Sequence, residues 1–274
     1  MAAAQTVKAA EALLITAGAG MGVDSGLPNF RGREGFWRAY PAAARMGLAF
    51  EELANPRWFK EHPRLAWAFY GQRLNLYRAT VPHAGFGRLL TWATAKPRGF
   101  FVFTSNVDGQ FQAAGFPSGQ MVECHGSIHH FQCCEPCCDA VWEARSEVVL
   151  VDEEAFLARE PLPRCPHCGG LARPNILMFG DDAWIGGRTD AQDDRFRAWL
   201  AGLEKDRVHC AVIELGAGTA IPTVRFCSER VARQLHGGLI RINPRECQVP
   251  GGHWGLPMGA LEGIEQLACQ GATL

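Results

Sequence analysis

Two groups of closely spaced cysteines are the residues of this chain best suited to hold a metal ion. The first group is the run Cys133-Cys134-Glu135-Pro136-Cys137-Cys138, and the second is Cys165-Pro166-His167-Cys168. Two cysteines separated by two residues form half of a common zinc site, in which four thiolates surround Zn²⁺ tetrahedrally and leave no position for substrate. The second group therefore predicts a structural zinc site. The first group is irregular, because either Cys133 or Cys134 can pair with Cys137.

A glycine-rich segment near the N-terminus has the composition of a phosphate-binding loop. The segment Gly18-Ala19-Gly20-Met21-Gly22 directly follows an apolar run. Glycines permit a tight turn and let backbone N–H groups approach a pyrophosphate. The dehydrogenase fingerprint needs its third glycine at position 23, where this chain has Val23. The loop therefore indicates dinucleotide binding and argues against ordinary hydride transfer.

The elements that must position these loops are apolar runs rich in β-branched residues. We predict buried strands at Ala12–Thr16, Phe100–Thr104, Cys210–Leu215 and Leu239–Ile242, each leading into a polar or glycine-rich loop. Between them, residues such as 65–77 and 86–95 show helical spacing. This alternation predicts an α/β fold with a doubly wound, Rossmann-like parallel sheet. Ligands bind beyond the carboxyl ends of such strands, so the loops should converge on one site.

Two segments interrupt the alternation of strands and helices. Residues 32–80 are rich in aromatic residues and helix formers, and residues 128–175 contain both cysteine groups with little periodicity. We predict a helical insertion over the first segment and a zinc-binding insertion over the second. The remainder, residues 1–31, 81–127 and 176–274, is predicted to form the Rossmann-like, dinucleotide-binding domain. A segment that buries little apolar surface needs a cross-link to stabilise its fold, and a bound metal ion can provide one.

The overall composition excludes several classes of protein. Lys and Arg number 27 against 28 Asp and Glu, a formal net charge of -1, so we expect no direct nucleic-acid partner. No apolar run approaches the roughly 20 residues that span a bilayer, so we expect no membrane contact. Residues 1–8 lack the features of a secretory signal, which predicts a cytoplasmic protein. In a reducing compartment the 11 cysteines are better explained as metal ligands or buried thiols than as disulfides.

Taken in order, the motifs resemble those of the sirtuin family, the NAD-dependent protein-lysine deacylases. The segment 18–31 resembles the family's nucleotide loop, in which Gly-Ala-Gly is followed by Ser-Gly-Ile-Pro-x-Phe-Arg. Further similarities follow along nearly the whole chain: Thr104-Ser105-Asn106-Val107-Asp108, Glu123-Cys124-His125-Gly126-Ser127, the two cysteine groups, Arg173 to Gly180, Gly218-Thr219-Ala220 and Ile242-Asn243. The chain is identified on these motifs as a divergent, bacterial-type member.

The resemblance implies NAD as a co-substrate that lies across the strand ends. The expected contacts are Gly18, Ala19, Gly20, Phe30, Arg31, Ser105, Asn106, Asp108, His125, Gly218, Thr219 and Asn243. By the same resemblance, Asn106 would bind the ribose and a water, and Asp108 would hold the nicotinamide carboxamide. His125 would be the general base, with Asn106 as the second catalytic residue. An imidazole suits this task because its unperturbed pKa lies near neutrality.

The implied substrates are proteins that carry acylated lysines. The products would be the deacylated lysine, nicotinamide and O-acyl-ADP-ribose. The strand and turn that resemble the family's peptide clasp contribute Ile176, Met178, Phe179 and Gly180. We expect the protein to act as a monomer.

A tyrosine and an arginine in the helical segment bear on the acyl group. Tyr70 and Arg73 are three residues apart, so they lie on one face of a helix. The pair resembles the Tyr-x-x-Arg pair of sirtuins that remove malonyl, succinyl or glutaryl groups. A guanidinium can bind both oxygens of a carboxylate, and the phenol adds a donor. We therefore expect this pair to admit acidic acyl groups as well as acetyl.

The resemblance also favours one assignment of the zinc ligands. Cys133 keeps the family's distance from His125, but the partner expected three residues later is replaced by Pro136. We therefore prefer one structural zinc bound by Cys133, Cys137, Cys165 and Cys168.

Three departures from the family pattern lie near the predicted nucleotide site. Gly22 and Ala220 stand where the family has serines, and Ser105 replaces a glutamine. Each lost side chain could weaken NAD binding by about 1 kcal/mol. These changes motivate an alternative function, an NAD glycohydrolase or protein ADP-ribosyltransferase that uses the same pocket. A non-enzymatic zinc-ribbon module is a further alternative, which the net charge of -1 disfavours.

Overall fold

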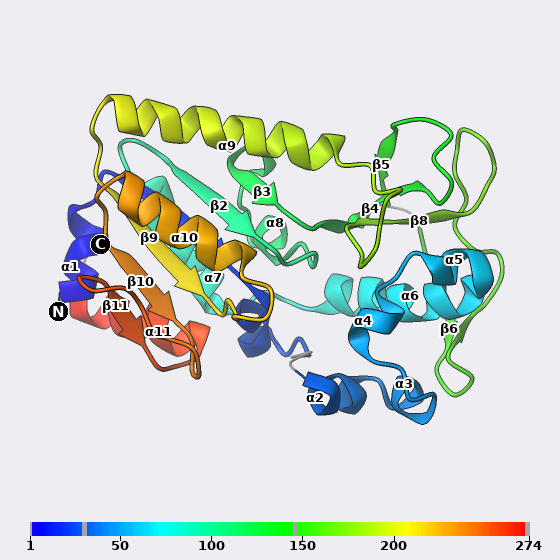
Figure 1. The fold of residues 1–274 in the computed structure, drawn as a ribbon. Coiled ribbons are helices and arrows are strands. Elements are labelled where there is room, and N and C mark those ends of the chain that lie inside the picture. Colours follow the sequence, from blue (N-terminus) through cyan, green and yellow to red (C-terminus); the bar gives the residue numbers. More distant parts are fainter. Residues whose placement is uncertain (1, 29–31, 145–146, 272–274) are drawn as a thin grey trace.

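The computed structural model describes residues 2–28, 32–144 and 147–271 of the chain. Its centre is a six-stranded sheet in the order β11-β10-β9-β1-β2-β3, with every neighbouring pair parallel (Figure 1). The strands are β1 (Ala12–Ala17), β2 (Phe100–Thr104), β3 (Met121–Glu123), β9 (Cys210–Leu215), β10 (Leu239–Ile242) and β11 (Trp254–Leu256). The four predicted strands are confirmed, with β1 one residue longer. The edge strands β3 and β11 are too short to give a sequence signal.

Helices cover both faces of this sheet. One face packs against α1 (Ala2–Ala9), α7 (Ala84–Thr94), α8 (Gln110–Ala113) and α11 (Ala260–Gly271), and the other against α9 (Gly187–Lys205) and α10 (Thr223–Gln234). Successive residues of β1 point to opposite faces, so Leu13 and Ile15 join the first core while Leu14 joins the second. Burial on both faces explains why these strands are mostly apolar. The predicted doubly wound α/β fold is confirmed.

A smaller module lies beside the sheet, in the right half of Figure 1. We call helices α2 to α6 and strands β4 to β8 the small module. Its helices are α2 (Gly32–Ala39), α3 (Pro41–Arg45), α4 (Phe50–Leu53), α5 (Arg57–Glu61) and α6 (Pro63–Ala79). Its strands are β4 (Gly126–Cys133), β5 (Val141–Glu143), β6 (Val151–Asp152), β7 (Leu157–Ala158) and β8 (Ala172–Ile176). β4 is the central strand of a three-stranded antiparallel sheet, in the order β5-β4-β8.

The helical segment and the cysteine-bearing segment share one hydrophobic core. Trp67 and Phe69 from α6 pack in the same cluster as Phe131 from β4 and Ala172 from β8. The Trp67 ring lies 5.1 Å from the Phe131 ring, and its indole N–H donates to the Ala172 carbonyl at 3.0 Å. The two predicted insertions therefore pack together, although they are far apart in sequence.

Short 3₁₀ helices also form at Ala19–Ser25 and Ser118–Gln120. Among the helices in the described part of the chain, none combines the length and the apolar character needed to cross a bilayer.

Candidate active site and cysteine cluster

A cavity of about 620 Å³ lies where the strand ends of the large sheet meet the small module. Most of the residues predicted to contact nucleotide or substrate line it. They are Gly18, Ala19, Tyr70, Arg73, Ser105, Asn106, Asp108, His125, Ile176, Met178, Phe179 and Gly218. The sheet contributes loops after β1, β2, β3 and β9, and the module contributes α6 and the end of β8. The loops thus converge as the parallel topology predicts.

The glycine-rich loop after β1 packs directly on the loop after β9. A Cβ atom added to Gly20 would lie 2.6 Å from the Gly216 Cα, and one added to Gly18 would lie 2.8 Å from the Ala217 Cα. Because real Cβ atoms do not approach backbone so closely, only glycine fits at both positions. Gly20 does not line the cavity. It lets the two backbones meet, so that Gly18, Ala19 and Gly216 form a continuous wall of the cavity.

The loop after β2 presents an amide and a carboxyl to the cavity. The Asn106 side-chain amide donates to the Gly18 carbonyl at 3.0 Å, which ties the β2 loop to the glycine-rich loop. An Asp108 carboxylate oxygen accepts the Gln110 N–H at 2.9 Å. Burial raises the pKa of Asp108 to about 6, against the effect of the Gln110 hydrogen bond. The site therefore holds a carboxylate that ionises close to neutral pH.

His125 follows the edge strand β3 and lies half-buried in the cavity wall. Burial lowers the pKa of His125 below its usual value, while a hydrogen bond with the Ser105 backbone acts in the opposite direction. The imidazole is therefore neutral at pH 7 and can accept a proton, as a general base must.

At the module end of the cavity, Arg73 lies among aromatic rings. Its guanidinium carbon is 5.2 to 5.7 Å from the ring centres of Phe50, Phe69, Tyr70 and Tyr77. The Arg73 Nε donates to the Tyr77 hydroxyl at 3.2 Å, which orients the guanidinium plane.

Tyr70 brings a second polar group to the same end of the cavity. Its hydroxyl is buried and has no hydrogen-bond partner among the described residues. Burial raises the pKa of this phenol well above its usual value, so it stays protonated and available as a donor. A buried donor without a partner is costly, which points to a polar ligand at this place.

The predicted peptide clasp follows β8 and is held at two points. The Phe179 N–H donates to the Ala54 carbonyl at 2.9 Å, and the Phe179 ring remains 40% exposed at the mouth of the cavity. Beneath it, Arg173 binds both oxygens of Asp181 at 2.7 and 2.8 Å in a buried ion pair. The clasp is therefore a fixed turn with an exposed aromatic side chain.

Some of the predicted contact residues do not line the cavity. The Asn243 side chain donates to the Ala217 carbonyl at 2.8 Å and accepts the N–H groups of Arg245 and Glu246. Thr219 donates its hydroxyl to the Glu246 carboxylate. These two residues thus support the loops after β9 and β10. Gly180 lies just outside the cavity lining.

Two further predicted contacts, Phe30 and Arg31, lie outside the described residues. Further residues that were not predicted also line the cavity, among them Leu27, Phe50, Tyr77, Leu177, Ile221 and Val224. Tyr77 lies four residues after Arg73, so the helical spacing that singled out Tyr70 and Arg73 could have found it. The apolar residues carry no such signal, because only the fold brings them to the cavity.

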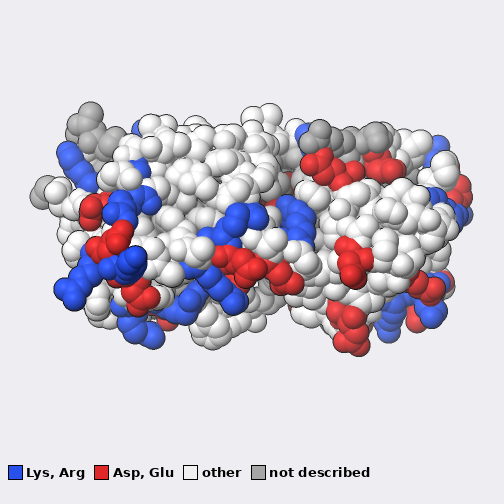
Figure 2. All heavy atoms as spheres, turned by 90° about the horizontal axis from the view of Figure 1, so that it is seen from above, with Lys and Arg blue, Asp and Glu red and all other residues white. Residues whose placement is uncertain are grey.

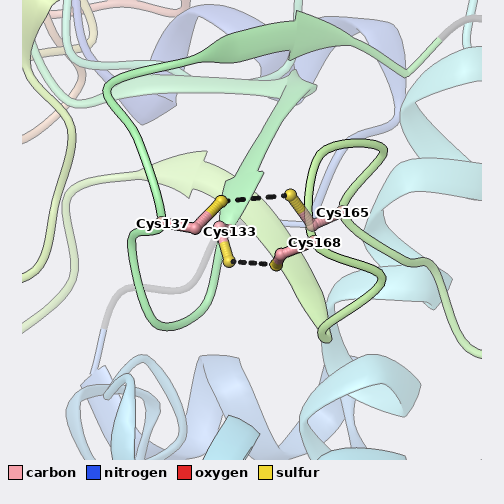
Figure 3. Close-up of side chains that lie close together, drawn as sticks. All are labelled: Cys133, Cys137, Cys165 and Cys168. Atoms are coloured by element: carbon pink, nitrogen blue, oxygen red, sulfur yellow. Dashed lines mark hydrogen bonds between the residues drawn. The ribbon is translucent and has the colours of Figure 1, made fainter.

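Figure 3 shows four cysteine thiols turned toward one another from two loops of the small module. The Sγ atoms of Cys133, Cys137, Cys165 and Cys168 all lie within 4.8 Å of one another. The Cys133–Cys168 and Cys137–Cys165 sulfur distances are 3.7 and 3.8 Å. Ligands about 2.3 Å from a zinc at tetrahedral angles would be about 3.8 Å apart, so the four thiols fit Zn²⁺.

At the end of β4, the structure decides whether Cys133 or Cys134 joins Cys137 in the cysteine cluster. Cys133 belongs to the cluster, whereas Cys134 packs against the hydrophobic core of the small module. Burial raises the pKa of Cys134 to about 12, so this thiol stays protonated. The preferred ligand set is the one that the fold brings together.

A model of the Sir2 family matches residues 18–191 of this chain. The chain belongs to the Sir2 family. The Sir2 match spans the glycine-rich loop, the His125 motif and both cysteine groups, which confirms the predicted resemblance to sirtuins.

Known Sir2 relatives are similar over much of the chain. A protein of Aquifex aeolicus named NAD-dependent protein deacylase is 29% identical over 85% of this chain and 83% of its own length. One of the same name from Pyrococcus furiosus is 36% identical, over 60% of this chain and 59% of its own length. A crystal structure of a Sir2 homologue in complex with NAD has a TM-score of 0.72 at 25% identity, covering 98% of this chain and 92% of that one.

Proposed function

We propose that this Sir2-family chain is an NAD-dependent protein-lysine deacylase that releases nicotinamide and O-acyl-ADP-ribose. The observation that carries the proposal is the convergence of Asn106, Asp108 and His125 on one cavity whose opposite end holds Tyr70 and Arg73. A dinucleotide site alone would not need the second end with its tyrosine and arginine. A substrate side chain entering beside the Phe179 clasp would reach the polar groups at both ends.

The cavity fits a dinucleotide in size and in chemistry. Its volume of about 620 Å³ lies within the range of small-molecule sites. The glycine-rich wall offers backbone close to a ligand, and Asn106 and Asp108 offer polar side chains beyond it. We expect Gly18, Ala19 and Gly218 to lie along the phosphates and sugars, and Asp108 to bind the carboxamide. NAD supplies an activated glycosidic bond whose cleavage releases nicotinamide.

His125 has the properties of the base that the reaction requires. It is neutral at pH 7, because burial lowers its pKa, and it faces the cavity. We infer that it takes a proton from a ribose hydroxyl. The Asn106 amide, held by the Gly18 carbonyl, is placed to orient a hydroxyl or a water beside it.

We infer that the cysteine cluster holds one structural zinc. When bound, the metal would cross-link the loop after β4 to the loop before β8 through Cys133, Cys137, Cys165 and Cys168. Four thiolates leave no open coordination position, so the metal would take no part in the chemistry.

The acyl group is proposed to include acidic chains as well as acetyl. The Tyr70 hydroxyl has no partner among the described residues, and the Arg73 guanidinium carbon lies 5.6 Å from the centre of the Tyr70 ring. A succinyl or malonyl carboxylate would accept from both groups, forming charge-assisted hydrogen bonds.

We further propose that acylated proteins are the partners, with no direct binding of nucleic acid. On the face in Figure 2, Lys and Arg side chains are interspersed with Asp and Glu rather than gathered into one basic area. This pattern does not favour a polyanion. The monomeric state and the cytoplasmic location stay predictions.

The deciding experiment measures nicotinamide release from NAD with and without an acylated peptide. We expect release to depend on the peptide, and His125→Ala to reduce it by about 10²- to 10⁴-fold. His209→Ala is the matched control. His209 is exposed and directly precedes β9, so it lies at the amino ends of the strands, whereas the cavity lies at their carboxyl ends. Nicotinamide release that does not depend on the peptide would instead support the alternative function. Free ADP-ribose as product would indicate a glycohydrolase, and labelled protein would indicate an ADP-ribosyltransferase.

A peptide panel tests the acyl specificity separately. We expect Arg73→Met to lower the rate on succinyl-lysine at least about tenfold relative to acetyl-lysine, through loss of a charge-assisted bond. Arg88→Met, at an exposed arginine on α7, is the control. An unchanged ratio of the two rates would refute the carboxylate-binding role of Arg73.

A further inference from the structure

Strand β4 contains an irregularity next to the candidate active site. Gly126 and Ser127 pair with β8, but the next paired residue of β4 is Phe131, and the register shifts between them. Within this bulge the backbone N–H of Ile128 donates to the Val107 carbonyl at 3.0 Å, in the loop after β2. Bulges next to active sites often redirect a side chain. Here the strand leaves its neighbour and binds the loop that carries Asp108.

The side chain redirected by the bulge is His129. Its Nε2 lies 2.9 Å from the Asp108 backbone carbonyl. A carbonyl only accepts hydrogen bonds, so Nε2 carries the hydrogen and donates. The imidazole also fills the space over Gly109, where an added Cβ would lie 2.6 Å from the ring. Gly109 has a φ of +72°, so the turn and the ring fit each other.

These contacts leave Asp108 held from two sides. Its carbonyl is bound by the His129 ring, and its carboxylate accepts the Gln110 N–H at 2.9 Å. Asp108 lines the cavity, whereas His129 does not. His129 therefore acts on any ligand only through Asp108.

We propose that His129 is a positioning residue that fixes the Asp108 carboxylate for binding the nicotinamide carboxamide. This proposal rests on the proposed function, in which Asp108 contacts that group. It predicts a defect confined to the nicotinamide end of the site. A merely structural histidine would instead weaken binding along the whole cavity.

The test compares two amides that place their N–H₂ groups differently. In His129→Gln the side-chain nitrogen can occupy the position of Nε2 and donate to the Asp108 carbonyl. In His129→Asn the side chain is one methylene shorter and cannot reach it. The two variants have similar polarity, so the difference between them isolates the hydrogen bond. His130→Gln is the control on the same strand, because the buried Nδ1 of His130 has no hydrogen-bond partner among the described residues, whereas the His129 ring binds the Asp108 carbonyl.

We would measure the inhibition constant of nicotinamide, the KM for NAD and the Kd of ADP-ribose by calorimetry. We expect His129→Asn to raise the first two about tenfold, the worth of one hydrogen bond, and to change the Kd of ADP-ribose less than about twofold. His129→Gln should restore values near those of the wild type.

Two results would overturn the proposal. One is equal nicotinamide inhibition of the Asn and Gln variants, and the other is a parallel loss of nicotinamide and ADP-ribose binding. If His129→Asn does not fold, His129→Gln still decides, since a tenfold nicotinamide defect in that variant refutes the role of the donor. If the wild type releases no nicotinamide with acylated peptide, the proposed function is wrong. Direct binding of nicotinamide and ADP-ribose to the wild type and to the His129 variants then still tests the positioning role of His129.

Discussion

The large sheet and the small module reach order by different physical means. Every residue of β1 and β9 is buried, and separate hydrophobic cores cover the two faces of the sheet. In the module, β6 and β7 are two residues long and three helices have five residues or fewer. The module relies on one core around α6 and on the cysteine cluster. We therefore expect the sheet to be stable through regular burial alone, and the irregular loops of the module to gain stability from a cross-link at the cysteine cluster.

The difference divides the tasks within the cavity. The sheet loops carry Asn106, Asp108 and His125, the groups proposed to act on NAD. The module carries Tyr70 and Arg73, proposed to select the acyl group. On this proposal, the chemistry depends on the loops of the sheet, and the acyl specificity depends on the module that carries the cysteine cluster.

Removal of the metal should produce the largest effect. It should unfold part of the small module while the large sheet stays folded. Structural zinc sites in small domains contribute about 10 kcal/mol or more, so chelation or Cys165→Ser should unfold the cysteine-bearing part of the module. We expect loss of the near-ultraviolet circular dichroism of the module tryptophans, with the far-ultraviolet signal of the sheet largely retained.

The control for metal removal is Cys138→Ser. The Cys138 thiol lies 3.8 Å from that of Cys137 but outside the cluster of four, so this variant should keep one zinc per chain. The tryptophan signal and the melting temperature of the chelated protein could instead match those of the untreated protein. That result would show that the module stays folded without metal.

Truncation of a sheet residue should have the next largest effect. Ile213 in β9 is fully buried in the core on one face, so Ile213→Ala should cost about 4 kcal/mol of unfolding free energy. Because the sheet needs no metal, we expect the same cost with and without chelator, measured by urea denaturation. A cost that vanishes on chelation would mean that the two parts fold as one unit.

Replacement of Asp108 should show that its ionised carboxylate destabilises the folded protein. The pKa of Asp108 rises from 3.8 to about 6 on folding, so its ionised form is disfavoured in the native state. Stability that is present below pH 3.8 is therefore lost as the pH rises through about 6, about 3 kcal/mol at 1.4 kcal/mol per unit. Asp108→Asn should be more stable than the wild type at pH 8 and equal to it at pH 3.5, while losing activity. Equal melting curves at pH 8 would contradict the raised pKa.

The smallest effect is expected at Gly22, a departure from the family pattern. A Cβ at this position would lie 2.8 Å from the Leu27 Cδ1, which lines the cavity. Gly22→Ser should therefore displace Leu27 and cost about 1 kcal/mol. A double-mutant cycle with Leu27→Ala should show favourable coupling of similar size, because the smaller side chain removes the clash. Additive changes in unfolding free energy would show that the two positions are independent.

Much of the fold was predictable because it depends on local patterns. Fully buried parallel strands are largely apolar runs, which placed β2, β9 and β10 at the observed bounds. The two charged residues within them, Glu214 in β9 and Arg241 in β10, are buried as an ion pair. The parallel topology then brings loops far apart in sequence to one edge, which placed Asn106 and His125 together. The shared core of the two insertions was not predictable, since irregular segments carry no periodic signal. The predicted boundaries between the domains stay predictions.

By itself, the sequence determined the sheet, the convergence of its loops and the residue types available for NAD, acyl-lysine and zinc. These follow from periodicity and from chemistry that few residue types can perform. Only the tertiary structure decided that Cys133 rather than Cys134 joins the cluster, that Asn243 supports a loop instead of lining the cavity, and that His129 binds the Asp108 carbonyl. Each of these depends on where a turn or a bulge directs one side chain, and that direction is set by packing between segments distant in the chain.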